Sequence, residues 1–341
     1  MRKYLLILSI LFLFPRTQAE AGEAGAIFLI IYPGARPNGM GAAFTALADD
    51  ALATYYNDAG LGFQENQDIS LMHANWLPGL YLGMYYEFIS YVHPVAGGTF
   101  GGHIIYLTTG ETVGMDENGN EIGRWTTWDA SAKISYGTKL TNTLALGVGA
   151  KWIYSFLVPL DIIREVLGQS YRFGGKGSSW AFDVSTLYIP NKWLQLGASL
   201  QNMGPNISYL EAGTSDPLPW TVRLGIAWHP FYSTPNKLTI SGELTKIVVG
   251  FLDDIRNEEK TTKERWTYIY QDTWKGLGVE YVMAEMFSVR GGYFWDEVGH
   301  RVGATFGGGI NLKGLRFDIG VDAALYDFPT ENYRFSLGYS F

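Results

Sequence analysis

Strict alternation of apolar with small or polar residues is clearest near the end of the chain. In the segment Tyr333–Phe341 one face carries only apolar residues, and these are Tyr333, Phe335, Leu337, Tyr339 and Phe341. The positions between them are Arg334, Ser336, Gly338 and Ser340. A β-strand places successive side chains on opposite faces, and membrane strands need about 9–11 residues where soluble strands have about 5–6. The pattern therefore predicts a membrane-spanning strand rather than a strand of a secreted β-sandwich or β-helix.

The same pattern recurs along the chain and predicts a set of fourteen strands. They are expected at 68–77, 80–93, 98–108, 126–139, 144–157, 178–189, 194–202, 218–229, 237–249, 274–283, 287–295, 301–312, 315–326 and 333–341. An even number is typical of single-chain bacterial barrels. The fold class we expect is an all-β membrane protein, a 14-stranded antiparallel outer-membrane β-barrel over residues 67–341 that Tyr333–Phe341 closes.

The connections between these strands predict the orientation of the barrel. Short turns are expected at Pro94–Gly97, Thr141–Thr143, Pro190–Lys192, Ala284–Met286 and Lys313–Gly314, and long loops at Thr109–Trp125, Val158–Gly177, Asn202–Pro217 and Gly250–Thr273. Short periplasmic turns and longer outer loops are the usual asymmetry. Within the long loops, Leu160–Leu167 has helical spacing before Gly168, and Asp253–Arg265 carries dense mixed charge that predicts a solvated loop.

Composition supports a barrel and excludes several other classes. Aromatic residues make up 15% of the chain and charged residues 17%, with 42 glycines. The absence of cysteine excludes disulfides, thiolate metal sites and cysteine nucleophiles. The net charge of −8 comes without a basic patch, which argues against nucleic-acid binding.

The first residues have the features of a secretory signal peptide. Arg2 and Lys3 precede the apolar run Tyr4–Phe14, and small residues follow at Thr17 and Ala19. The alternative, a permanent anchor, would need about 20 apolar residues. We therefore expect residues 1–19 to be a signal peptide that directs Sec-dependent export to a Gram-negative-type outer membrane, with the mature chain starting near Glu20.

Candidate catalytic and metal-binding groups are sparse. His93 and His229 each precede a proline and are interpreted as residues at turn edges, and His300 with Asp296 is the best catalytic candidate by position. A surface histidine beside an acidic loop is the favoured interpretation of that pair. We predict no enzyme activity, no cofactor and no metal site.

Charges and glycines inside the strands have structural interpretations. Arg316, Asp318 and Asp322 fall on the inward face, where cross-strand pairing is favoured over a role in lining a channel. The clusters Gly291–Gly292 and Gly307–Gly309 lie within strands, where close packing or bending explains them better than phosphate binding.

Residues 20–66 precede the first strand and do not alternate. The stretch Gly34–Leu61 is rich in glycine and alanine and largely apolar. An exposed apolar segment of this size is unfavourable. A hatch or plug folded into the barrel is therefore expected, and a loose periplasmic extension is the alternative.

The stretch Gly34–Leu61 resembles the N-terminal signature of the PorV/PorQ family of outer-membrane proteins, which is related to the fatty-acid transporter FadL. The matching residues of this hatch motif are Gly34, Ala35, Arg36, Gly39, Met40, Gly41, Ala48, Asp49, Asp50, Asn57, Ala59, Gly60 and Leu61. The chain departs from the family at Asp58, where proline is usual. Shorter matches follow at His73–Trp76, Leu200–Pro205 and Pro217–Pro219, so that the resemblance spans the mature chain.

The resemblance implies a fourteen-stranded barrel with an N-terminal hatch and two alternative functions. The first is a shuttle or translocon partner of the type IX secretion system, which would bind the translocon and the C-terminal signal domains of secreted cargo. The second is a FadL-like transporter of long-chain fatty acids or other hydrophobic compounds, with an apolar mouth formed by Val158, Leu160, Ile162, Ile163 and Leu167. A structural barrel without a ligand is the remaining possibility, and in each case outer-membrane lipid surrounds the wall.

The last strand also resembles the signal that the barrel-assembly machinery recognises, carried here by Tyr333, Phe335, Leu337, Tyr339 and Phe341. Deletion of Phe341, or loss of Tyr339, is therefore expected to impair insertion into the outer membrane. The measurement is the amount of heat-modifiable barrel in outer-membrane fractions. Normal amounts in the variants would contradict this role for the last strand.

Overall fold

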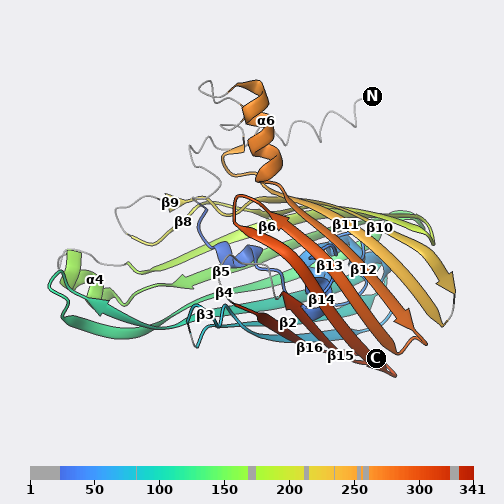
Figure 1. The fold of residues 1–341 in the computed structure, drawn as a ribbon, viewed down its shortest axis with the longest axis horizontal. Coiled ribbons are helices and arrows are strands. Elements are labelled where there is room, and N and C mark those ends of the chain that lie inside the picture. Colours follow the sequence, from blue (N-terminus) through green and yellow to red (C-terminus); the bar gives the residue numbers. More distant parts are fainter. Residues whose placement is uncertain are drawn as a thin grey trace.

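A closed antiparallel barrel of fourteen strands dominates the computed structural model (Figure 1). The structure describes residues 24–81, 83–167, 174–210, 215–233, 235–251, 255, 261–322 and 330–341. The predicted signal peptide, Gly168 and the end of the predicted strand 315–326 lie outside these residues. The strands follow one another around the wall in chain order, so each is paired with its sequence neighbours.

The strands of the wall are β1 (Asp68–Asn75), β2 (Tyr85–Val95), β3 (Gly98–Met115), β4 (Glu121–Lys139), β5 (Leu144–Phe156), β6 (Lys176–Asn191), β7 (Leu194–Met203), β10 (Thr221–Ser233), β11 (Asn236–Ile247), β12 (Trp274–Met283), β13 (Phe287–Asp296), β14 (Arg301–Leu312), β15 (Leu315–Asp322) and β16 (Asn332–Ser340). The predicted fold class is confirmed, since each of the fourteen predicted segments overlaps one of these strands.

Closure of the barrel is achieved by pairing of the first and last strands. β16 lies antiparallel to β1 from the pair Asp68↔Ser340 to the pair Ala74↔Arg334, and to β15 on its other side. The backbone amide of Phe341 donates to the carbonyl oxygen of Gln67 at 3.0 Å. No strand edge is left open at this seam, as a membrane barrel requires.

The alternation of the sequence becomes the two faces of the wall. On β16, Phe335 is 53% exposed on the outside, whereas its neighbour Arg334 is 3% exposed and faces inward. The inward charges pair across strands as predicted: Arg316 with Asp68 at 2.7 Å, Arg290 with Asp318 at 2.5 Å and Arg334 with Asp322 at 2.8 Å. The wall therefore presents apolar side chains to lipid and keeps its charges in the lumen.

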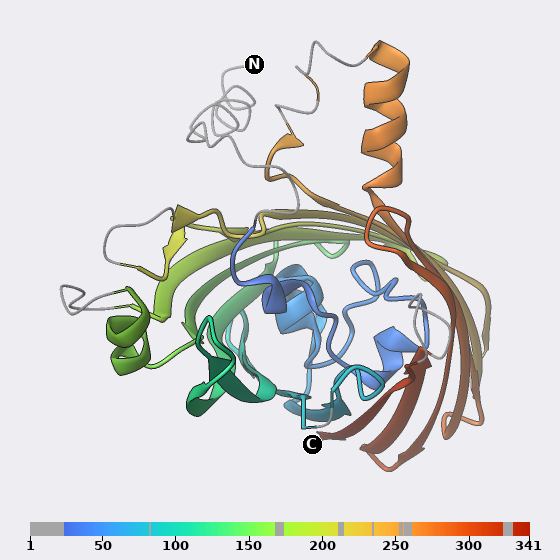
Figure 2. The ribbon, with the colours of Figure 1, turned by 60° about the vertical axis from the view of Figure 1, so that its left-hand side comes forward.

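Residues 24–67 lie inside the wall and are called the N-terminal segment below (Figure 2). Its short elements are η2 (Ile27–Ile30), α2 (Ala35–Asn38), α3 (Ala53–Tyr56) and η3 (Asp58–Phe63). Met40, Phe44 and Tyr56 are completely buried, and they pack in one apolar cluster with wall residues such as Phe88 and Ile153.

The remaining elements belong to the loops at the end of the barrel opposite the short turns, called the long-loop end below. They are the helix α4 (Leu160–Leu167), the strand pair β8 (Ile207–Ser208) and β9 (Ser215–Asp216), and the helix α6 (Thr262–Gln271). The helix predicted at Leu160–Leu167 is confirmed. Among the described residues, no helix combines the length and the apolar character needed to cross a membrane.

One predicted loop is wrong in the structure, and a second contains a helix. Most of Thr109–Trp125 is strand, because β3 and β4 continue as a two-stranded ribbon beyond the rest of the wall and turn only at Asp116–Asn120. The carboxylate of Asp116 accepts hydrogen bonds from the amides of Asn118 and Asn120 at 2.8 Å, which stabilises the turn expected at Asn118–Gly119. In the predicted solvated loop Asp253–Arg265, the described part includes the start of α6, where Thr261 and Glu264 form a capping box.

The expected turn Pro94–Gly97 and the two histidines at predicted turn edges also need correction. β2 includes Pro94 and Val95, so the turn is shorter than expected. His93 and His229 both lie within strands, and His229 is 1% exposed, with its Nδ1 atom 3.0 Å from the hydroxyl of Thr239. The following proline ends neither strand. In β2, Pro94 is still paired with Thr99. In β10, the strand continues past the proline with a shift of register between Trp228 and Phe231.

Candidate functional site

The contact between the N-terminal segment and the inner wall is the candidate functional site, because almost all of the predicted motif lies there. A segment inside a barrel must approach the wall closely and must satisfy its own backbone groups. The wall does this with glycines and with buried charged side chains, which are described in turn.

Inward-facing glycines allow the backbone of the N-terminal segment to lie against the backbone of the wall. At each of these positions a Cβ atom would come within 3.2 Å of the segment: Gly137, Gly147, Gly197, Gly225, Gly276, Gly278, Gly292, Gly307 and Gly320. At Gly292, for example, a Cβ atom would lie 2.2 Å from the amide nitrogen of Gly41. The interpretation of Gly292 and Gly307 as close-packing glycines is therefore confirmed.

The glycines of the predicted motif have matching roles on the segment side. Gly34 and Gly41 have φ values of +92° and +60°, which side chains other than glycine rarely adopt. A Cβ atom on Gly39 would lie 2.9 Å from Cα of Gly307, and one on Gly60 would lie 2.2 Å from the carbonyl oxygen of Ala48. The Met40 side chain is completely buried.

Arg36 joins the segment to the wall through carboxylates from both. Its Nε atom lies 2.9 Å from Glu280 of β12, and its Nη1 atom lies 2.6 Å from Asp49 and 3.3 Å from Asp50. Glu280 also accepts from Arg290 at 2.6 Å. Burial raises the pKa of Asp50 to about 6 although the Arg36 guanidinium opposes the shift.

Asn57 fixes the turn into η3. Its side-chain amide donates to the carbonyl oxygens of Thr45 at 2.8 Å and Thr186 at 3.0 Å, and its Oδ1 atom accepts from the amide of Ala59 at 3.0 Å. The first contact is within the segment and the second is to β6 of the wall. The structure thus brings Gly34, Arg36, Gly39, Met40, Gly41, Asp49, Asp50, Asn57 and Gly60 together in the lumen.

Asp58, where the chain departs from the family pattern, has a role that sequence reasoning missed. Its carboxylate lies 2.8 Å from Nζ of Lys133, which also lies 2.5 Å from Asp183. Lys151 lies 2.9 Å from the same Asp183, and all four side chains are buried. The available signal was the presence of Lys133 and Lys151 on the inward face of alternating strands, since a lysine there needs a buried partner.

Arg223 forms a second buried centre that sequence reasoning missed. It is 1% exposed, and its guanidinium carbon lies 4.6 Å from the centre of the Tyr32 ring and 5.4 Å from that of Tyr55. Its Nη1 atom lies 3.2 Å from Glu243, whose other oxygen accepts from the amides of Phe44 and Thr45. A wall arginine and a wall glutamate thus contact four residues of the segment: Tyr32, Tyr55, Phe44 and Thr45.

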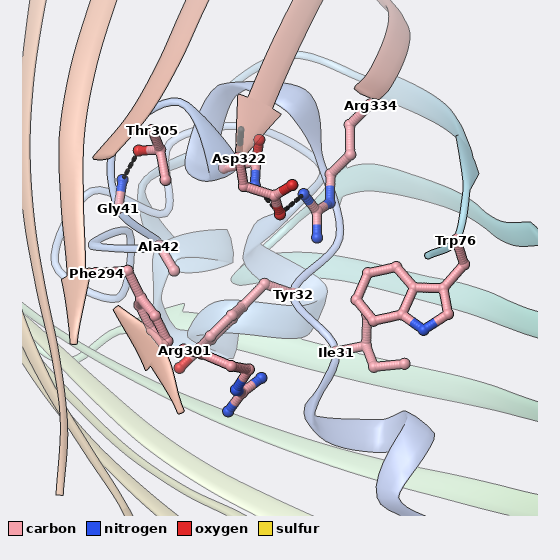
Figure 3. A pocket seen from close by; sticks show the side chains of 11 residues that line it. Ile31, Tyr32, Gly41, Ala42, Trp76, Phe294, Arg301, Thr305, Asp322 and Arg334 are labelled. Atoms are coloured by element: carbon pink, nitrogen blue, oxygen red, sulfur yellow. Dashed lines mark hydrogen bonds and ion pairs between the residues drawn. The ribbon is translucent and has the colours of Figure 1, made fainter. Parts of the chain in front are cut away.

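A small cavity remains between the segment and the β13–β16 side of the wall (Figure 3). Its volume is about 30 Å³, which leaves room for about one water molecule. Tyr32 and Ala42 lie on the segment side, and Phe294, Arg301 and Thr305 on the wall side. The hydroxyl of Thr305 accepts from the amide of Gly41 at 3.0 Å. At this level the lumen is filled by the chain itself.

The other candidate residues lie away from this contact. Asp296, predicted as a possible partner of His300, lies 2.6 Å from Arg301 and accepts from the amide of Gly299 at 2.9 Å. The residues of the predicted assembly signal, Tyr333, Phe335, Leu337, Tyr339 and Phe341, are 38–54% exposed on the outside of the barrel.

Comparisons with known proteins were made for both sequence and fold. The family described as "Type IX secretion system protein PorV" matches residues 15–253. No curated protein gives a significant match.

Among solved structures, the toluene transporter TbuX of Ralstonia pickettii has a TM-score of 0.56 at 14% identity, over 91% of this chain and 98% of TbuX. The toluene transporter TodX of Pseudomonas putida has a TM-score of 0.54 at 13% identity, over 90% and 97% of the two chains. The monoaromatic hydrocarbon channel CymD gives 0.52 at 11% identity, over 90% and 96%. Identities this low show a shared fold and nothing more.

Substitution of Gly292 is expected to loosen the N-terminal segment, because the Cβ atom of valine would collide with the backbone of Gly41. Overpacking of this kind costs about 1–3 kcal/mol or more. Gly291 is the matched control, since it is the neighbouring residue on the outer face and a Cβ atom there meets nothing within 4 Å. Conductance in planar bilayers is expected to rise for Gly292→Val and to stay at the wild-type level for Gly291→Val. Equal conductance of the two variants would contradict a lumen closed by this contact.

Replacement of Lys133 is expected to destabilise the protein, because it leaves Asp58 and Asp183 with less compensation in a buried site. The expected loss for Lys133→Met is about 3–5 kcal/mol of unfolding free energy. Urea unfolding in detergent, followed by tryptophan fluorescence, measures it. Arg124→Met provides the control, since Arg124 pairs with Glu111 and Glu121 on the exposed ribbon and its loss should change the unfolding midpoint little. Similar midpoints for the two variants would show that the buried charges do not stabilise the fold.

Proposed function

Because the chain belongs to the PorV family of type IX secretion system proteins, we propose that this outer-membrane barrel takes part in type IX protein secretion as a cargo-binding shuttle or translocon partner. The N-terminal segment acts as a hatch that keeps the lumen closed. Proteins with a C-terminal signal domain are the cargo, and the long-loop end of the barrel is where they bind.

The observation that carries this proposal is the filled lumen. Phe28, Met40, Phe44 and Tyr56 are at most 1% exposed, and buried ion pairs tie the segment to both sides of the wall. A barrel whose interior is occupied by its own chain is suited to act through its surface. Surface binding is what a shuttle or translocon partner requires, and a conduit would need the segment to move.

The β3–β4 ribbon is the element of the long-loop end best placed to make such contacts. It extends past the wall together with α4 (Figure 1). Nε1 of Trp125 on the ribbon donates to the carbonyl oxygen of Leu157, shortly before α4, at 2.7 Å. Met115 at the ribbon tip is 57% exposed and Val166 of α4 is 61% exposed. Exposed apolar side chains on a protruding element are typical of a protein-binding surface.

The decisive experiment compares surface proteomes of a deletion strain complemented with two forms of the barrel. Loss of signal-domain proteins from the surface is expected on deletion, and the wild-type chain should restore them. A shortened form, in which an Asn-Gly turn replaces residues 111–126, should not restore them although it reaches the outer membrane in normal amounts; Gly110 and Thr127 are directly paired, so a two-residue turn fits there. Unchanged export in the deletion strain would overturn the proposed function. Full restoration by the shortened form would remove the ribbon from it.

A second candidate function, transport of hydrophobic compounds, is favoured by the shared fold with proteins described as toluene transporters. It requires Phe28 and Leu29 to leave the apolar cluster that they now fill. Uptake of toluene and of long-chain fatty acids by the deletion strain tests it. Normal uptake of both compounds would count against this function.

A further inference from the structure

The outer surface of the wall has a groove that the lumen and its contents do not explain. It has a volume of about 600 Å³ and is lined mainly by β10, β11 and β12. The outward-facing residues that line it include Leu224, Ile226, Gly242, Leu244, Tyr270 and Leu277. A volume in this range is sufficient for a small molecule or a segment of a longer one.

The floor of the groove is an outward-facing glycine. Gly242 is directly paired with Ile226 on one side and Leu277 on the other, and both of these side chains point outward. A Cβ atom on Gly242 would lie 3.5 Å from Cγ2 of Ile226 and 3.6 Å from Cδ2 of Leu277, which are ordinary contact distances. Gly242 therefore leaves a channel between two rows of apolar side chains on the surface that faces lipid.

The last turn of helix α6 borders the long-loop end of this channel. In both views of the ribbon, α6 stands outside the barrel and projects sideways from the wall near β11–β13 (Figures 1 and 2). Tyr270 lines the groove, and Trp266, one turn away on the same side of the helix, is 60% exposed. Tryptophan and tyrosine are enriched where a membrane protein meets the membrane–water interface.

The charged side chains at the rim of the groove, Lys275 and Glu297, pair with each other. Binding in the groove therefore depends on its apolar interior. Nζ of Lys275 lies 3.9 Å from the centre of the Tyr270 ring and 3.4 Å from Glu297. The cation is thus held against the helix and has an acidic partner of its own. The four aliphatic side chains Leu224, Ile226, Leu244 and Leu277 are 49–52% exposed within a membrane-facing surface.

We propose that this groove binds one acyl chain of a lipid of the outer leaflet, with α6 lying on the membrane as its roof. The groove lies at the long-loop end of the barrel, so the lipid would belong to the outer leaflet. The glycine at its floor leaves room for an acyl chain, which is one methylene wide, between the neighbouring apolar side chains. A flat apolar wall without such a groove would contact lipids without binding any one of them in a fixed place. A bound chain fixes α6, and with it the loop between β11 and β12, relative to the membrane surface.

Native mass spectrometry of the full-length barrel, purified from outer membranes in mild detergent and offered phosphatidylethanolamine with saturated chains, tests the groove. One retained lipid per wild-type barrel is expected. Gly242→Leu fills the floor with the leucine side chain and should lower retention at least about tenfold, because the acyl chain loses its apolar contacts there. Gly291→Leu, also on the lipid-facing surface but in open space, should retain the lipid. Equal retention by the two variants, or a second copy of the chain in place of lipid, would overturn the proposal.

The placement of α6 has its own test, which does not depend on lipid surviving purification. The chain contains no cysteine, so a single nitroxide can be attached at Trp266→Cys in the otherwise unaltered barrel. In phosphatidylethanolamine and phosphatidylglycerol vesicles, the label should be more accessible to oxygen than to a water-soluble nickel chelate. A label at Val166→Cys on α4, which is 61% exposed, should show the opposite order. The same aqueous order at both sites would show that α6 does not lie on the membrane.

Discussion

Backbone-to-backbone contact between the N-terminal segment and the wall is the constraint on which the rest of this structure depends. A fourteen-strand wall encloses more space than its own inward side chains fill, and the remaining space must hold water, ligand or chain. Here it holds chain, and that chain is largely irregular. Its amides and carbonyls cannot all pair with one another, so the wall has to come close enough to bind them. The inward glycines permit that approach, and hydroxyl and carboxylate groups such as Thr305 and Glu243 accept the amides that remain.

The buried charges follow from the same constraint. A charge in the lumen is costly unless it is paired and hydrogen-bonded, and pairing alone does not make it a source of net stability. The arrangement around Lys133 and Arg223 therefore says more about specificity than about strength. Each of these side chains binds an acidic group of the wall and, at the same time, a group of the segment. Together these contacts favour this placement of the irregular segment inside the barrel over others that would leave a buried charge unpaired.

The difference between what the sequence predicted and what it missed has a physical basis. Lipid imposes the alternation of β10–β16, so their number and most of their limits could be predicted from one sequence. The ribbon Gly110–Thr127 lies beyond lipid, carries charges such as Glu111 and Arg124 on its strands, and was therefore taken for a loop. The pairing of Asp58 with Lys133 joins residues 75 positions apart, and no local pattern contains it. The resemblance to a family drew attention to the stretch Gly34–Leu61, but the partners of Arg36 and Asn57 became visible only with the wall around them.

A filled lumen changes where specificity has to reside. In an open barrel, the inward side chains select what passes, and the outside only has to be apolar. In this protein the inward side chains are already engaged by the N-terminal segment, so selectivity falls to the outside and to the long-loop end. Two features there depart from what lipid and solvent alone would require: a ribbon with α4 that extends beyond the rest of the wall, and a helix α6 that projects sideways from the wall beside the groove. The first can meet a protein beyond the membrane, while the second can fix the barrel at the membrane surface. A shuttle of the proposed kind would need both kinds of contact, because an orientation held by lipid would determine which way the ribbon points.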